Sequence, residues 1–274
     1  MQIDTIGNIK FDKKTINYLA VLKPAATAIL LSPFKTSLKD IIRYTLMDLE
    51  LKRVLSITHK NMKLHPNDVH VRRRDSLEIG ENFTTYRKSE YENYFLSFLN
   101  EESYYHLHSY LYKVYADTPM DSRMKRNILK EHKILNLFST AFSFNMLGLF
   151  LLNANGRKVR REIKRYFVTI EQHLPQIIEN SPEQALQLVS FLKGNFFLLK
   201  NISVETLEKL NQRIRLHKKE IKDEYFDLFD IFEFSDVFFH DISTEISWLL
   251  RNIERTYNRK QGSSNNGDTS ADFF

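Results

Sequence analysis

Apolar residues recur at every third or fourth position along most of the chain, a spacing that gathers them on one face of a helix. A short apolar helix is predicted at 24–31, where proline is tolerated at the first position, and a second at 37–53, with Ser37 as its N-cap. Alternating residues at 54–59 and 69–72 predict the two strands of a hairpin. Two helices followed by a hairpin is the order of a winged helix.

The remainder of the chain predicts further helices. The segment 88–116 has helical spacing on both sides of Asn100 and predicts two helices. A long helix is predicted from Gly156, with an apolar stripe from Val159 to Ile178. The run 185–199 is apolar almost all round and predicts a central, buried helix. Other helices are expected to start near residues 121, 203 and 241.

These patterns predict a mainly α fold class: a winged-helix-like N-terminal part, made of two helices plus a β-hairpin, followed by a multi-helix bundle. We predict a winged-helix-like region at 1–87 and a helical domain packed on it at 88–260. The tail at 261–274, rich in Gly, Ser, Asn and Asp, is predicted to be disordered.

The run from Leu135 to Leu152 carries no charge and is almost long enough to span a membrane, so it has to be tested as a membrane span. Asn136 and Asn145 count against a span, because amide side chains are costly in hydrocarbon. A buried strand or helix of the core is therefore the expectation.

The composition removes several kinds of chemistry. The 274 residues include no cysteine, so thiolate nucleophiles and cysteine-containing zinc sites are excluded. Seven scattered glycines leave no glycine-rich phosphate loop. His106 and His108 would diverge on a helix, and the acids within 227–236, spaced by three, would wind around one. We expect no cofactor, no metal ion and no enzymatic activity; an enzyme with an unrecognised site is the least favoured alternative.

Concentrated basic residues are the strongest functional signal. The net charge is +6, and six bases with one acid fall within 157–165. A second basic helix is predicted around Arg123, and Arg72–Arg74 add three bases in a row. Arg and Lys bind phosphate on nucleic acid or on anionic lipid, although a solvated helix face carries similar charge. The predicted anion-binding residues are Arg123, Arg126, Arg157, Lys158, Arg160, Arg161, Lys164 and Arg165.

Three short motifs together resemble a known family. They are LELKRVLSI at 49–57, the stretch 126–135, and Leu149–Leu152 leading into the basic helix. In this order they are similar to the chain plan of the Golgi phosphoprotein 3-like family and related bacterial cytosolic domains.

That resemblance implies a mostly helical fold with a winged-helix-like start, peripheral on membranes. Eukaryotic members of the family bind phosphorylated inositol lipid through a tryptophan and arginines. The only tryptophan here, Trp248, lies in the last predicted helix, and Arg43 and Arg126 fall near but not on the family's lipid-contacting positions. Those roles are therefore not carried over.

The sequence favours a non-enzymatic peripheral membrane or adaptor protein that binds an anionic surface through basic helix faces. The expected partners are an anionic membrane surface or a protein. The start of the chain lacks the apolar run of a secretory signal, so a cytoplasmic location, peripheral on the membrane, is the expectation.

The alternative is a winged-helix nucleic-acid-binding protein, with the helix 37–53 in the major groove and the hairpin 54–74 as the wing. Against it, Asp40, Asp48 and Glu50 would share the exposed face of that helix and repel phosphate.

Overall fold

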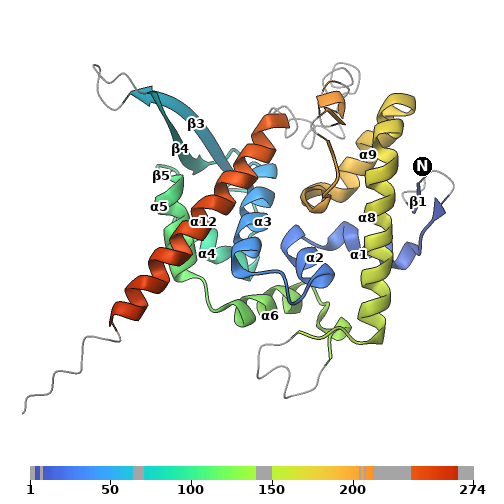
Figure 1. Ribbon diagram of the computed structural model, residues 1–274, viewed down its shortest axis with the longest axis horizontal. Helices are drawn as coiled ribbons and strands as arrows, with labels where there is room; N and C mark the ends of the chain where they lie inside the picture. The colour runs from blue at the N-terminus through green and yellow to red at the C-terminus, as the bar shows by residue number, and fades with distance from the viewer. Residues whose placement is uncertain are drawn as a thin grey trace, which may run out of the picture.

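The computed structural model describes residues 4–6, 9–63, 71–139, 150–203, 205–206, 208–210, 212 and 236–264. Figure 1 shows a mainly helical molecule with a hairpin at one side, so the predicted fold class is confirmed.

The predicted winged-helix order is present near the N-terminus. The elements are α2 (Pro24–Leu31), α3 (Leu38–Leu51), β3 (Leu55–Lys63) and β4 (Val71–Ile79). Helix α3 begins with a capping box, in which the side chains of Ser37 and Asp40 each accept a hydrogen bond from the other's backbone N–H. Strands β3 and β4 pair antiparallel, with Ile57 opposite Leu77 on the buried face.

Three short elements precede this unit and were not predicted: β1 (Thr5–Ile6), β2 (Ile9–Lys10) and α1 (Lys13–Val21). Asp12 caps α1 by accepting a hydrogen bond of 3.0 Å from the backbone N–H of Thr15. Helix α1 buries only Thr15, Ile16 and Leu19. So short an apolar stripe is easily missed in a sequence.

The prediction of two helices across 88–116 is only partly right. The elements found are η1 (Glu90–Glu92), α4 (Asn93–Leu96), β5 (Tyr104–His106) and α5 (Leu107–Asp117). Residues 104–106 form a strand because they pair with β4, where Tyr105 lies opposite Leu77. Aromatic residues suit such a strand, and β5 covers an otherwise open sheet edge.

The two predicted basic helices are both present. They are α6 (Asp121–Glu131) and α8 (Ala154–Asn180), and the turn η2 (Leu135–Leu137) lies between them. Asn153 caps α8, its side-chain oxygen accepting a hydrogen bond of 2.9 Å from the N–H of Gly156. The stripe from Val159 to Ile178 is buried, as its spacing predicts.

The single helix predicted over 185–199 is wrong in its second half. Helix α9 (Pro182–Leu192) ends early and the turn η3 (Lys193–Leu198) follows. Lys193 has φ 49°, and the Asn195 side chain donates hydrogen bonds of 3.1 and 2.8 Å to two carbonyls at the end of α1. These tertiary contacts end the helix. The periodicity of apolar residues cannot predict them, because they involve a distant segment of the chain.

The last helix, α12 (Asp236–Ser264), starts before the predicted Asp241 and runs past Lys260. The structure describes residues 261–264 of the predicted tail as helical, and residues 265–274 lie outside the described residues, so the disorder of the tail stays a prediction. The apolar stripe marks only the packed middle of α12, whereas backbone hydrogen bonds continue the helix beyond it.

Helix α2 lies at the centre of the arrangement. Figure 1 shows α12 crossing α3 and α5 on one side of the molecule and α8 on the other, with α2 between them. Buried apolar side chains form one cluster that runs from Ile6 to Ile253. The regions 1–87 and 88–260 thus share a core, while the boundary itself stays a prediction.

The run 135–152 is described only at its two ends. Phe138 and Leu152 pair as an antiparallel bridge and are both buried, whereas residues 140–149 lie outside the described part of the chain. Among the helices that the structure describes, none combines the length and apolarity needed to cross a membrane.

Candidate anion-binding surface

Six bases of α8 lie on the side of the helix away from the core. At about 100° per residue, they fall within an arc of about 160° on the helix surface. Five of them are exposed and Arg160 is half-buried, whereas Val159, Ile163 and Tyr166 opposite are buried. We call this set the α8 basic face: Arg157, Lys158, Arg160, Arg161, Lys164 and Arg165.

Two members of the face also have structural contacts. Arg157 donates a hydrogen bond of 2.9 Å to the carbonyl of Leu152. Arg165 pairs with Glu162 at 2.7 Å, and its guanidinium lies 4.7 Å from the ring centre of Phe11. Glu162, the one acid of this segment, also accepts a hydrogen bond from a backbone N–H just before α1. Its negative charge is therefore already engaged.

The bases near the start of α8 gain nothing from the helix dipole. The first turn of α8 has no acidic residue, and Arg157 and Lys158 follow directly after it. The N-terminal end of a helix carries partial positive charge, which favours acids there and not bases. The dipole of α8 therefore does not account for Arg157 and Lys158.

The face continues into a pocket. Lys164 lines a cavity of about 440 Å³ together with residues of α2, α3 and the 32–36 loop on one side and the end of η3 on the other. Lys35 and Lys200 also line it. Partial burial and the charges of Arg160, Lys200 and Lys35 lower the pKa of Lys164 below its ordinary value. Three cations from distant parts of the chain therefore meet at this cavity.

The predicted bases of α6 are not part of this arrangement. Arg123 and Arg126 are exposed, but they lie on a separate helix that Figure 1 shows apart from α8. Between them, Lys125 is buried; it pairs with Asp121 at 2.7 Å and donates a hydrogen bond of 3.3 Å to the carbonyl of Pro33. Part of the basic character of α6 thus holds the 32–36 loop in place.

The histidines, the acidic series and the arginine run that the sequence singled out do not add to this surface in the described part of the chain. His106 ends β5 whereas His108 lies in α5, and no group of three His, Asp or Glu residues with metal-ligand geometry occurs among the described residues. The side chains of Arg72–Arg74 and of the acids within 227–236 lie outside the described part.

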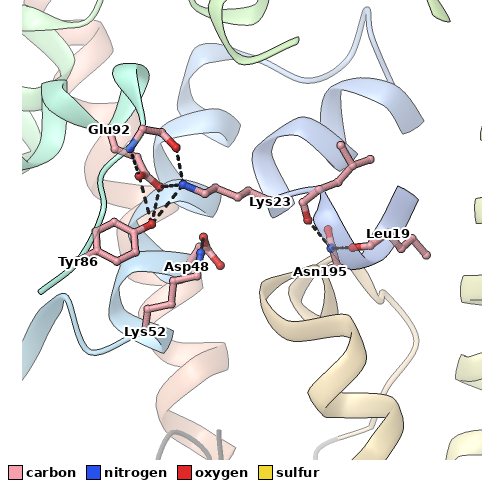
Figure 2. Close-up of polar contacts among 9 residues, drawn as sticks. Leu19, Lys23, Asp48, Lys52, Tyr86, Glu92 and Asn195 are labelled. Carbon is pink, nitrogen blue, oxygen red and sulfur yellow. Dashed lines mark hydrogen bonds and ion pairs between the residues drawn. The ribbon is translucent and has the colours of Figure 1, made fainter. Parts of the chain in front are cut away.

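A buried polar network was missed in the sequence. Lys23 donates hydrogen bonds to Ser89 at 2.6 Å, to Glu92 at 2.7 Å and to Tyr86 at 3.2 Å. Glu92 is fully buried and accepts further bonds from the Tyr86 hydroxyl and the Ser89 N–H. Figure 2 shows Lys23, Tyr86 and Glu92 converging on one point. The network fixes the segment before η1 onto the start of α2.

Asp48 and Lys52 form an ion pair beside this network (Figure 2). Burial raises the pKa of Asp48 above its ordinary value, although Lys52 opposes the change. Burial and the charge of Lys23 lower the pKa of His132 to about 4. The spacing of residues along the sequence does not predict this network, because its members come from the ends of α2, α3 and α6 and from the segment around η1.

Every residue of helix α3 is buried or half-buried. None of its residues is exposed, and Asp48 and Glu50 are buried, which corrects the expectation of an exposed face that carries both acids. Lys39 pairs with Glu254 of α12, and Arg43 donates a hydrogen bond of 3.0 Å to Ser247. Helix α12 therefore lies over the side that a winged helix would present to DNA.

Comparison of the chain with protein-family models, curated proteins and solved structures finds no match. The resemblance to the Golgi phosphoprotein 3-like family therefore stays a prediction based on short motifs.

Proposed function

We propose that this chain is a non-enzymatic protein that binds an anionic surface through the α8 basic face, as a peripheral membrane protein or adaptor. The observation that carries the proposal is the gathering of six bases on one arc of α8, of which only Arg165 forms a salt bridge, with Glu162, in the described part of the chain. Basic clusters of this kind are attracted to anionic lipid by about 1 kcal/mol per base.

Exposed apolar side chains beside the face support a membrane as the surface. Val168, one turn beyond Lys164, is 49% exposed, and Phe34, next to Lys35, is 62% exposed. Apolar side chains among bases suit the boundary between lipid headgroups and acyl chains.

The nucleic-acid alternative requires a recognition helix that is free to contact DNA. A recognition helix has to enter the major groove, and α3 has no exposed residue in this structure. Basic residues of α8 would still attract a nucleic acid through its phosphates, so salt-sensitive binding to duplex remains the outcome to test against.

The experiment is co-sedimentation with vesicles of phosphatidylcholine alone or mixed with phosphatidylserine. Lys158→Glu/Arg161→Glu reverses two exposed bases that form no salt bridge among the described residues. We expect at least about tenfold weaker binding to the anionic vesicles, because two attractive charges become repulsive.

The matched control is Arg87→Glu/Lys88→Glu, which makes the same change in net charge at two exposed residues before η1. Its effect should stay below about threefold, since charges away from the contact are screened by salt. Equal loss in both variants would mean that net charge alone, not the α8 basic face, governs binding.

A further inference from the structure

We propose that the pocket between α8 and the α2–α3 unit is a binding site for an organic phosphate that has an apolar body. The site consists of Lys35, Lys164 and Lys200 around a cavity of about 440 Å³. That volume lies in the range of sites for small molecules, about 300–1,000 Å³. The proposal goes beyond the α8 basic face, which needs only a charged surface and no cavity.

The three lysines form no salt bridge in the described part of the chain, although the carboxylates of Asp40 and Glu171 also line the cavity. Lys35 and Lys200 both act electrostatically on Lys164. Like charges held together raise the energy of the empty site, and an anion that binds among them relieves this repulsion. A dianion such as a phosphate monoester relieves it more than a carboxylate does.

The two carboxylates at the pocket already serve other contacts. Glu171 accepts hydrogen bonds of 2.6 Å from the N–H of Lys200 and 2.7 Å from the side chain of Asn201. Asp40 accepts from Ser37 in the capping box of α3. Glu171 is thus a positioning residue: it fixes the segment that brings Lys200 to the cavity, and its oxygens are taken up in doing so.

Part of the remaining wall of the pocket is apolar, beside the polar side chains of Ser32, Thr36, Tyr44 and Asn201. Ala28 and Leu31 of α2, Phe167 and Val168 of α8, and Leu198 of η3 line it. Such a wall excludes water from an aromatic or acyl group and contributes affinity that a bare phosphate cannot gain. The ligand is therefore amphiphilic, with its phosphate at the lysines. A lipid headgroup and a soluble phosphate ester share this chemistry.

The test is calorimetric titration of the full chain with 1-naphthyl phosphate, with 1-naphthol and inorganic phosphate as partial ligands. We expect one site that binds 1-naphthyl phosphate at least about tenfold more tightly than either partial ligand. Lys164→Gln/Lys200→Gln should weaken this binding at least about tenfold, because two charge-assisted hydrogen bonds are lost.

The matched control is Lys158→Glu/Arg161→Glu, which alters α8 bases that do not line the pocket. It should retain binding of 1-naphthyl phosphate while losing binding to anionic vesicles, so failure of the pocket and failure of the proposed surface are separate results. Circular dichroism melts verify folding, and Lys35→Gln replaces the double variant if that variant does not fold.

The proposal is overturned by the absence of a one-to-one site for 1-naphthyl phosphate, by equal affinity for 1-naphthol, or by unchanged binding in the lysine variants. Competition identifies the source of the ligand. Displacement of 1-naphthyl phosphate by vesicles that contain phosphatidic acid indicates a lipid headgroup, whereas its retention indicates a soluble phosphate ester.

Discussion

At the scale of single residues, Glu50 shows what burial does to a carboxyl group. It is 9% exposed, one of its oxygens has no hydrogen-bond partner, and burial raises its pKa to about 8. In the unfolded chain the same group has a pKa near 4.5. Glu50 is therefore protonated in the folded protein at neutral pH, which explains how an acid is tolerated inside α3.

This assignment predicts a pH dependence of stability. The folded state holds the proton of Glu50 more tightly than the unfolded state, so stability is complete below pH 4.5 and falls as the pH rises through 8. The loss amounts to at most about 1.4 kcal/mol per pH unit for one proton. Glu50→Gln mimics the protonated group and should abolish this loss.

The measurement is the free energy of unfolding by urea at pH 5, 7 and 9. The wild-type and Glu50→Gln curves should lie close together at pH 5 and separate in favour of the variant at pH 9. The exposed Glu183→Gln serves as a control that should follow the wild type. Parallel curves for all three proteins would show that Glu50 is ionised in the fold.

At the scale of elements, Gly194 lies where η3 comes close to the α2–α3 unit. A Cβ atom at this position would lie 2.3 Å from the Asp48 carboxylate and 2.9 Å from the side chain of Pro24. Gly194→Ala should therefore push the elements apart and cost about 1–3 kcal/mol of stability. Thermal unfolding checks this, with the exposed Glu183→Ala as control, and an unchanged Tm for Gly194→Ala would contradict the packing.

The same comparison of elements shows what a sequence can and cannot predict. Helices α3, α6 and α8 follow from apolar spacing, because each packs one stripe against the core. Helix α2 is buried all round and follows from its continuous apolar run. Strand β5 and the turn η3 do not, since they depend on pairing with β4 and on the contacts of Asn195. The local pattern of apolar residues fails to predict an element wherever a distant segment supplies its hydrogen-bond partners.

The candidate site divides in the same way. The α8 basic face is predictable, because its residues are neighbours on one helix and the period of 3.6 places them on one side. The pocket is not, because Lys35, Lys164 and Lys200 meet only after α2, α8 and η3 have packed together. The burial of Lys125 is not predictable either, because it depends on Asp121 and on the carbonyl of Pro33 in a distant loop.

At the scale of the whole molecule, the two faces of the α2–α3 unit differ in their neighbours. On one side α12 covers α3 through contacts such as that of Lys39 with Glu254. On the other side α8 presents bases and the exposed Val168, and a pocket opens beside it. The surface that a winged helix would use for DNA is thus internal, and charge is concentrated on a different helix.

The central claim is that the α8 basic face binds an anionic membrane surface, and one measurement tests it most directly. Wild-type protein is sedimented with neutral and phosphatidylserine-containing vesicles at low and moderate salt, beside a mobility-shift assay on duplex DNA. We predict sedimentation with the anionic vesicles and not with the neutral ones, weakened but not abolished by salt, because apolar side chains contribute. Equal sedimentation with neutral vesicles, or salt-sensitive binding to duplex without vesicle binding, would contradict the claim.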